Sequence, residues 1–149
     1  MRKGILIVTI FLIMVSGGYF WINNRSVKII AVHHNANTVD VLVEQFPISH
    51  TAQIKWWRKN KNITLRDNNI LTYEKGGPRY ITIFAFGEGY QELGKKDRLC
   101  FDHLPRPKNC IDKDILMMIS TNREGKEIYE FDYSAYMIND KGKIVKAGG

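Results

Sequence analysis

An uninterrupted apolar stretch near the amino terminus constrains this chain more than any other feature. Residues 4–22 carry no charged side chain, and a helix of that length spans about 28 Å, close to the ~30 Å hydrocarbon thickness of a bilayer. Residues 19–21, Tyr-Phe-Trp, close the stretch with aromatic side chains that favour the headgroup region. We therefore predict a membrane anchor in residues 1–25, with a basic tip at 1–3, that contacts the lipid bilayer through residues 4–22.

The flanking residues predict how this anchor is oriented and processed. Arg2 and Lys3 favour an amino terminus retained in the cytoplasm, so the rest of the chain is expected on the far side. A cleavable signal peptide is the alternative, because Ser16 and Gly18 are small residues that suit a cut after Gly18. Bulky aromatic residues directly after that cut favour the uncleaved anchor. In either case residues 26–149 are exported.

The net charge of +7 over 149 residues divides between the anchor and the exported domain. Three basic residues, Arg2, Lys3 and Arg25, flank the span, so 22 − 3 = 19 Lys and Arg remain against 15 Asp and Glu, a balance of +4. A domain of about 125 residues has room for one modest core. Its mild basicity requires no anionic partner, and export argues against nucleic acid as a partner.

The two cysteines fit an oxidising compartment. We predict a disulfide between Cys100 and Cys110, around a loop in which Pro105 and Pro107 prevent a continuous helix. A zinc site would combine both cysteines with His103 and a distant fourth ligand, in a spacing that matches no standard zinc module. Separate, reduced cysteines are the remaining alternative. We expect neither a metal nor a cofactor.

Alternating and β-branched segments predict a sheet in the exported domain. Strands are predicted at 27–34 and 38–46, and the turn residues Asn-Ala-Asn between them indicate an antiparallel hairpin. Further strands are expected at 79–86, 99–101, 115–119, 127–133, 136–138 and 143–145. Short connecting turns favour an antiparallel sheet. With one or two helices covering one face of this sheet, the domain is predicted to be α+β.

One helix is predicted after Pro47 ends the second strand. It begins at Ser49 or Thr51, which can cap it, and runs to about Lys61. Its apolar face is expected to contain Ala52, Trp56 and Ile63, widened by Ile54 and Trp57.

The adjacent tryptophans of this helix suggest a function. Trp56 and Trp57 point about 100° apart on a helix, so they cannot fill one core pocket. An outward-facing tryptophan beside Lys55 and Arg58 could stack on a sugar, contact the membrane surface or anchor a protein partner. The simpler alternative, which we prefer, is that both tryptophans pack against a wide sheet face.

The other titratable residues form no recognised catalytic pattern. His33 and His34 alternate across a strand and cannot readily chelate one metal, while His50 lies at a helix start. Four carboxylates are close in sequence to a glycine-containing turn: Glu88, Glu92, Asp97 and Asp102. Motifs for a serine nucleophile, a phosphate loop or a zinc protease are missing from the sequence. We therefore expect that the chain is not an enzyme.

Six short segments follow one another in a specific order and spacing. They are Ile-Ala-Val-His-His-Asn at 30–35, Val-Asp-Val-Leu-Val at 39–43, Ile-Lys-Trp-Trp at 54–57, Phe-Gly-Glu-Gly-Tyr at 86–90, Asp-Arg-Leu-Cys-Phe-Asp at 97–102 and Asn-Cys-Ile at 109–111. Together they resemble small enterobacterial membrane proteins classified only as a domain of unknown function. The resemblance implies a membrane segment, a short exported domain and a Gram-negative source, and hence a periplasmic location. It supplies no catalytic residues.

Two functional hypotheses remain. The first is a non-enzymatic inner-membrane protein whose periplasmic domain binds a protein partner. The candidate partner-binding residues, from the predicted helix and from the loop between the cysteines, are Lys55, Trp56, Trp57, Arg58, His103 and Arg106. Because the resemblance also points to relatives beside secreted-toxin genes, one form of this hypothesis is immunity-like protection against an envelope-targeting toxin. The second hypothesis is a periplasmic domain that binds or senses a glycan or another ligand.

Overall fold

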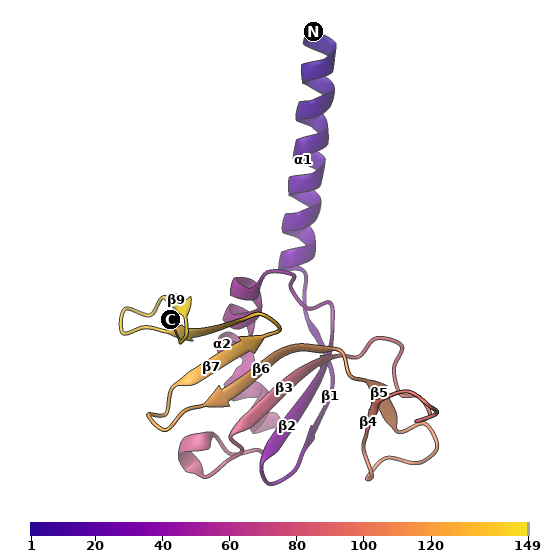
Figure 1. Ribbon diagram of the computed structural model, residues 1–149, viewed down its shortest axis with the longest axis vertical. Coiled ribbons are helices and arrows are strands. Elements are labelled where there is room, and N and C mark those ends of the chain that lie inside the picture. Colours follow the sequence, from indigo (N-terminus) through magenta and orange to yellow (C-terminus); the bar gives the residue numbers. More distant parts are fainter. Residues whose placement is uncertain (149) are drawn as a thin grey trace.

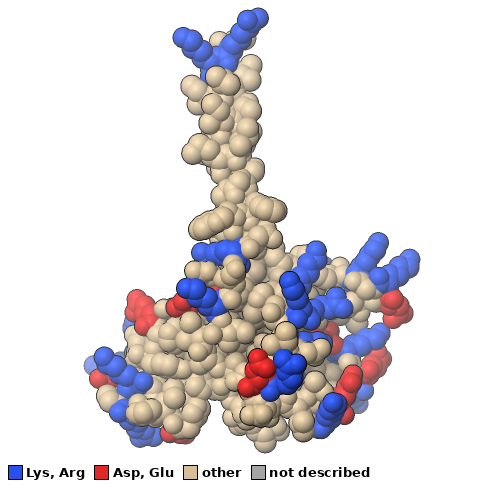
Figure 2. Space-filling model, turned by 180° about the vertical axis from the view of Figure 1, so that it is seen from behind, with Lys and Arg blue, Asp and Glu red and all other residues tan. Residues whose placement is uncertain are grey.

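The computed structural model describes residues 1–148 and shows a long amino-terminal helix followed by a sheet domain (Figure 1). Helix α1 runs from Arg2 to Asn24 and, among the described residues, is the one helix long and apolar enough to cross a bilayer. None of its residues is buried against the domain. Figure 2 shows the visible side of this helix without charged side chains between basic groups at its tip and its base. A signal sequence near an amino terminus would have the same length and composition.

The domain contains a seven-stranded sheet and a separate two-stranded sheet, which confirms the α+β class. The order in the large sheet is β1-β2-β3-β6-β7-β8-β9, and β4 pairs with β5. The strands are β1 (Lys28–His34), β2 (Thr38–Glu44), β3 (Tyr80–Ala85), β4 (Arg98–Cys100), β5 (Cys110–Asp112), β6 (Ile115–Thr121), β7 (Glu127–Phe131), β8 (Ser134–Ile138) and β9 (Ile144–Lys146).

The predicted hairpin is present, but one pair of strands differs from the predicted antiparallel arrangement. β1 and β2 are antiparallel, and the Asn35 side chain stabilises their turn by accepting hydrogen bonds from the backbone N–H groups of Asn37 and Thr38 (2.9 and 3.0 Å). β2 and β3 are parallel, whereas the other paired strands are antiparallel. The parallel pair exists because a helix carries the chain from the end of β2 back to the start of β3.

That helix, α2 (His50–Asp67), begins as predicted and ends later than predicted. The Ser49 hydroxyl caps it by accepting a hydrogen bond from the Ala52 N–H (3.2 Å). The helix does not stop near Lys61, because packing on the sheet outweighs the modest helix propensities of the residues that follow. It ends before Asn69, whose φ of 57° is in the left-handed region that asparagine tolerates.

α2 covers one face of the large sheet, with an apolar face rotated from the predicted one. Ile54, Trp57 and Leu65 are buried there among Val and Ile side chains of β2 and β3. Ile63 was predicted to belong to this face and is instead 52% exposed. The prediction was wrong because the buried residues follow the helical repeat through the added turns to Leu65, and Ile63 lies outside that stripe.

The opposite face of the same strands is covered by β4, β5 and their loops. Leu42 of β2 and Phe84 of β3 pack there with Phe101 and Ile111 in a second, smaller core. β2 and β3 are therefore buried on both faces. The sequence did not reveal β5 as a strand because its three residues are too few to show an alternating pattern. It also did not reveal the short 3-10 helix η1 (Tyr73–Lys75).

α1 is joined to the domain through Asn23. The Asn23 Oδ1 atom accepts hydrogen bonds from the backbone N–H groups of Ile48 and Ser49 (both 2.9 Å), and its Nδ2 donates to the Ser49 hydroxyl (3.1 Å). Because Ser49 also caps α2, the end of α1 and the start of α2 share one hydrogen-bonded junction. We call this the Asn23 joint.

The burial of Trp57 predicts a large loss of stability on truncation. Trp57 is 0% exposed, so Trp57→Ala should lower the free energy of unfolding by about 3–5 kcal/mol, measured by chemical denaturation of the chain in detergent. Lys55→Ala, on the exposed side of the same helix, should change it by less than about 0.5 kcal/mol. Equal effects of the two substitutions would contradict the packing of α2 described above.

Candidate functional site

Residues 86–114 form a unit of their own on the large sheet, which we call the disulfide unit. Cys100 and Cys110 are joined by a disulfide, and they are directly opposite residues of the antiparallel strands β4 and β5. Both sulfur atoms are used in this bond, so neither cysteine is available as a zinc ligand beside His103. The bond fixes the base of the loop at 101–109, which contains no helix or strand.

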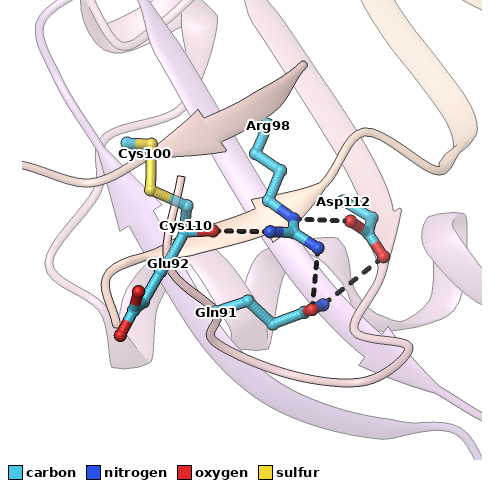
Figure 3. Close-up of polar contacts among 6 residues, drawn as sticks. All are labelled: Gln91, Glu92, Arg98, Cys100, Cys110 and Asp112. Carbon is cyan, nitrogen blue, oxygen red and sulfur yellow. Dashed lines mark hydrogen bonds and ion pairs between the residues drawn. A yellow bond between two sulfur atoms is a disulfide. The ribbon is translucent and has the colours of Figure 1, made fainter. Parts of the chain in front are cut away.

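Arg98 connects the segment before β4 to strand β5 within this unit (Figure 3). Its guanidinium donates hydrogen bonds to the Asp112 carboxylate (2.9 Å), the Gln91 side-chain oxygen (2.8 Å) and the Glu92 carbonyl (2.5 Å). The hydrogen bond and the positive charge of Arg98 hold the pKa of Asp112 below its usual value. The Arg98 side chain is 11% exposed, whereas the Asp112 side chain is 48% exposed, so water still reaches the carboxylate of this ion pair.

A histidine from β1 ties the disulfide unit to the large sheet. His33 is buried, with its ring stacked on Phe101 at a centroid distance of 4.0 Å. Its Nδ1 atom lies 2.8 Å from His103 Nε2, and its Nε2 atom lies 2.8 Å from the Tyr90 hydroxyl. Because both ring nitrogens are engaged, His33 acts as a polar link between two layers and not as a free base.

Burial perturbs the titration of this cluster. Desolvation, with a smaller contribution from the charge of His103, lowers the pKa of His33. Desolvation also raises the pKa of the Tyr90 hydroxyl and of the Asp40 carboxyl, which lies opposite His33 on β2. The cluster is therefore most stable with His33 uncharged.

The outer side of the disulfide unit is exposed and carries charges of both signs. Asp102 and Arg106 form a surface ion pair at 3.6 Å, and His103 lies between them in sequence, exposed apart from its link to His33. A hollow of about 470 Å³ lies beside them, with Leu93 and Pro107 also in its wall. Two of the predicted partner-binding residues, His103 and Arg106, thus lie together on one rigid loop.

The other predicted partner-binding residues lie on α2, which covers the opposite face of the sheet. Trp57 is fully buried, and Trp56 is partly buried with its ring edge-on to Phe46 at 5.3 Å. Lys55 and Arg58 are exposed beside them. Trp57 therefore presents no ring for stacking and Trp56 exposes only part of its side chain, and the α2 residues do not form one continuous surface with the loop of the disulfide unit.

A second cleft, not predicted from the sequence, lies between the end of α2, η1 and the sheet. Its volume is about 250 Å³, and we call it the distal cleft. Lys61 pairs with Glu127 (2.8 Å), and the Tyr129 hydroxyl donates to the other Glu127 oxygen (2.7 Å). Burial raises the pKa of Tyr129. No local signal could have found this cleft, because Lys61 and Glu127 are distant in sequence and meet only when the sheet forms.

The four carboxylates noted in the sequence do not converge. Asp97 pairs with Lys113 (2.7 Å) and Asp102 with Arg106, while Glu88 and Glu92 are exposed. Within residues 1–148, no three His, Cys, Asp or Glu side chains lie close enough together to hold a metal ion.

The profile of one protein family, described as enterobacterial putative membrane protein (DUF943), matches residues 1–148. The chain belongs to this family. The match spans α1 and the whole sheet domain, which confirms the resemblance found in the sequence, and the function of the family is unknown. Comparisons with curated proteins and with solved structures gave no match.

The lowered pKa of His33 predicts a loss of stability in mild acid. As the pH falls through about 6.5, the unfolded chain binds a proton that folded His33 resists, so the free energy of unfolding should decrease. His33→Gln should flatten this dependence between pH 7 and pH 5, measured by chemical denaturation. The pKa of Asp40 is raised, so protonation of its carboxyl increases the free energy of unfolding at lower pH. The measurement therefore ends at pH 5, before this opposite effect dominates.

His34→Gln provides the matched control for this measurement. His34 is the exposed neighbour of His33 on the same strand, and its replacement should leave the slope against pH unchanged. A slope that is equally steep in wild type and His33→Gln would show that the buried histidine does not govern the acid sensitivity.

Proposed function

We propose that this chain is a single-pass inner-membrane protein whose periplasmic domain binds a protein partner through the outer side of the disulfide unit. In this proposal the domain acts by binding and not by catalysis. The proposal goes beyond the membrane character of the family, and it makes the loop with Asp102, His103 and Arg106 the contact surface.

The unbroken path of α1 supports an anchor that is retained after export. The helix continues through Gly17 and Gly18, where a signal peptidase would cut, and ends at Asn24. The Asn23 joint connects its end to the domain, so a cut after Gly18 would leave a short apolar helix stub on the domain. Arg2 and Lys3 at the other end favour a cytoplasmic amino terminus.

The observation that carries the binding proposal is that this loop is fixed before any partner arrives. The disulfide closes its base, the Asn109 side-chain amide donates a hydrogen bond to the Phe101 carbonyl across that base (3.1 Å), and the His33 link holds it to β1, while its outer side chains remain exposed. Because the loop is already ordered, binding of a partner costs little conformational entropy in the loop, and this favours affinity. The hollow beside Arg106 could receive one protruding side chain of the partner.

Immunity-like protection is the form of this proposal that a membrane anchor suits best. An anchored inhibitor stays at the outer surface of the inner membrane, where an envelope-targeting toxin must arrive. Deletion of the chain's gene should then sensitise cells in competition with a toxin-producing neighbour. Unchanged survival of the deletion strain, together with a partner captured by crosslinking, would leave protein binding in place and overturn the immunity form.

Charge reversal on the loop tests the binding surface. Arg106→Glu should reduce the crosslinked complex recovered from envelope extracts by about tenfold, or ~1.4 kcal/mol of binding free energy. The substitution should leave the fold intact, because Arg106 is 78% exposed and its ion pair with Asp102 is on the surface.

Arg58→Glu on α2 is the control with the same charge change. It lies on the opposite face of the sheet and should leave the yield of the complex unchanged. The reverse outcome, in which only Arg58→Glu loses the complex, would move the binding surface to α2 and overturn the proposal.

Ligand binding or sensing is the second candidate function, and the distal cleft is the observation that favours it. With Trp57 buried and Trp56 only partly exposed, stacking of a glycan on α2 loses support, but the cleft offers Arg79, the Lys61–Glu127 pair and Tyr73 to a polar ligand. Titration with cell-wall fragments would shift amide resonances of these residues if they bind there. Unchanged spectra would argue against this candidate.

A further inference from the structure

The Asn23 joint determines the depth at which the adjacent part of the domain lies. Asn23 follows Trp21 by two residues, so in a membrane-spanning α1 it lies at the headgroup level. The backbone N–H of Ile48 is hydrogen-bonded directly to the Asn23 side chain (2.9 Å). Ile48 must therefore lie at the same level as the aromatic end of α1. This step rests on the proposed function, because it requires α1 to be an uncleaved anchor.

Contacts extend from this joint to the turn between β7 and β8. His50, the first residue of α2, stacks on Phe131 at a centroid distance of 3.8 Å. His50, Ile115 and Tyr133 line one hollow of about 190 Å³. Figure 1 shows the start of α2, the start of β1 and the β7–β8 turn grouped around the base of α1, while η1 lies at the far end of the domain.

Large apolar side chains are exposed at this end of the domain. Tyr133 is 100% exposed, Ile48 is 52% exposed and Ile115 is 43% exposed, and two isoleucines at the start of β1 are each 40% exposed. We define these five residues as the proximal rim: Ile29, Ile30, Ile48, Ile115 and Tyr133. Single exposed apolar residues also occur elsewhere on the domain, such as Leu71 (58%), but the residues of the rim gather around the end of α1, where the interface of a bilayer accommodates such side chains.

The charged residues next to the rim indicate whether it would bind anionic headgroups or the zone between headgroups and acyl chains. Arg25 follows α1 and Lys28 precedes Ile29, whereas Asp114 precedes Ile115 and Asp132 precedes Tyr133. Two carboxylates therefore balance the two cations, and the rim has no net positive charge for anionic headgroups. Its exposed groups instead match the zone between headgroups and acyl chains, where tyrosine and isoleucine are both accommodated.

We propose that the proximal rim docks on the outer surface of the bilayer that α1 crosses, with Tyr133 inserted at the headgroup level. The domain then rests on the membrane in one orientation and does not swing freely on its helix. The rim and α1 form one continuous membrane-contacting surface, joined through Asn23.

Tryptophan fluorescence in vesicles tests this contact with the full chain. Lipids brominated near the headgroup end of the acyl chains quench a tryptophan that reaches the interface. Tyr133→Trp is made in a Trp21→Phe background, and the signal of Trp56 and Trp57 is subtracted by means of that background alone. We expect the added emission to fall at least about twofold, equally in zwitterionic and anionic vesicles.

Leu71→Trp in the same background is the matched control. Leu71 is 58% exposed and lies beside η1, at the end of the domain remote from α1. Its added emission should not be quenched. Quenching of Tyr133→Trp no stronger than that of Leu71→Trp would overturn the docking of the rim.

The unmodified chain separates this failure from a failure of the anchor. Trp21 should be strongly quenched if α1 spans the bilayer, whatever the rim does. An unquenched Trp21 would overturn the anchor and, with it, the rim proposal. A quenched Trp21 with an unquenched Tyr133→Trp would leave the anchor in place and overturn the rim proposal alone.

Discussion

The burial of β2 and β3 on both faces is the constraint on which the rest of the domain depends. Val41 and Ile83 point toward α2, and Leu42 and Phe84 point toward the disulfide unit, so each strand requires two covering layers. α2 supplies one layer and also makes the β2–β3 pair parallel, because the chain must return along the sheet. The disulfide unit supplies the other layer. A site on either layer is thus positioned by the same two strands.

Local patterns in the sequence predicted those parts of the fold that depend on neighbouring residues. The β1–β2 hairpin followed from strand alternation around Asn35, and the start of α2 followed from Ser49. The parallel pair did not follow, because it depends on where α2 returns the chain. Leu42 and Val43 are adjacent apolar residues, and both are buried. Consecutive apolar residues are typical of a strand covered on both faces, so this part of the sequence could have suggested a second layer.

The candidate sites also divide into those that neighbouring residues predict and those that depend on contacts between distant residues. His103 and Arg106 lie in a loop whose prolines and flanking cysteines are visible in the sequence, so the rigid loop could be predicted. His33 could not be predicted to support that loop, because its partners Tyr90 and His103 are distant in sequence. The Lys61–Glu127 pair of the distal cleft is hidden for the same reason. Chemistry formed by contact between layers becomes visible only once the layers are in place.

The Asn23 joint gives these sites a defined relation to the membrane. A helix connected by a flexible linker would let every surface of the domain face the bilayer in turn, whereas three hydrogen bonds at Asn23 fix the end of α1 to the start of α2. In an anchored chain the distal cleft then faces away from the bilayer, because η1 lies at the opposite end of the domain from α1 (Figure 1). The disulfide unit lies at the side of the sheet and extends toward the end of the domain away from α1 (Figure 1), so in an anchored chain a protein partner could reach its loop without contacting the bilayer.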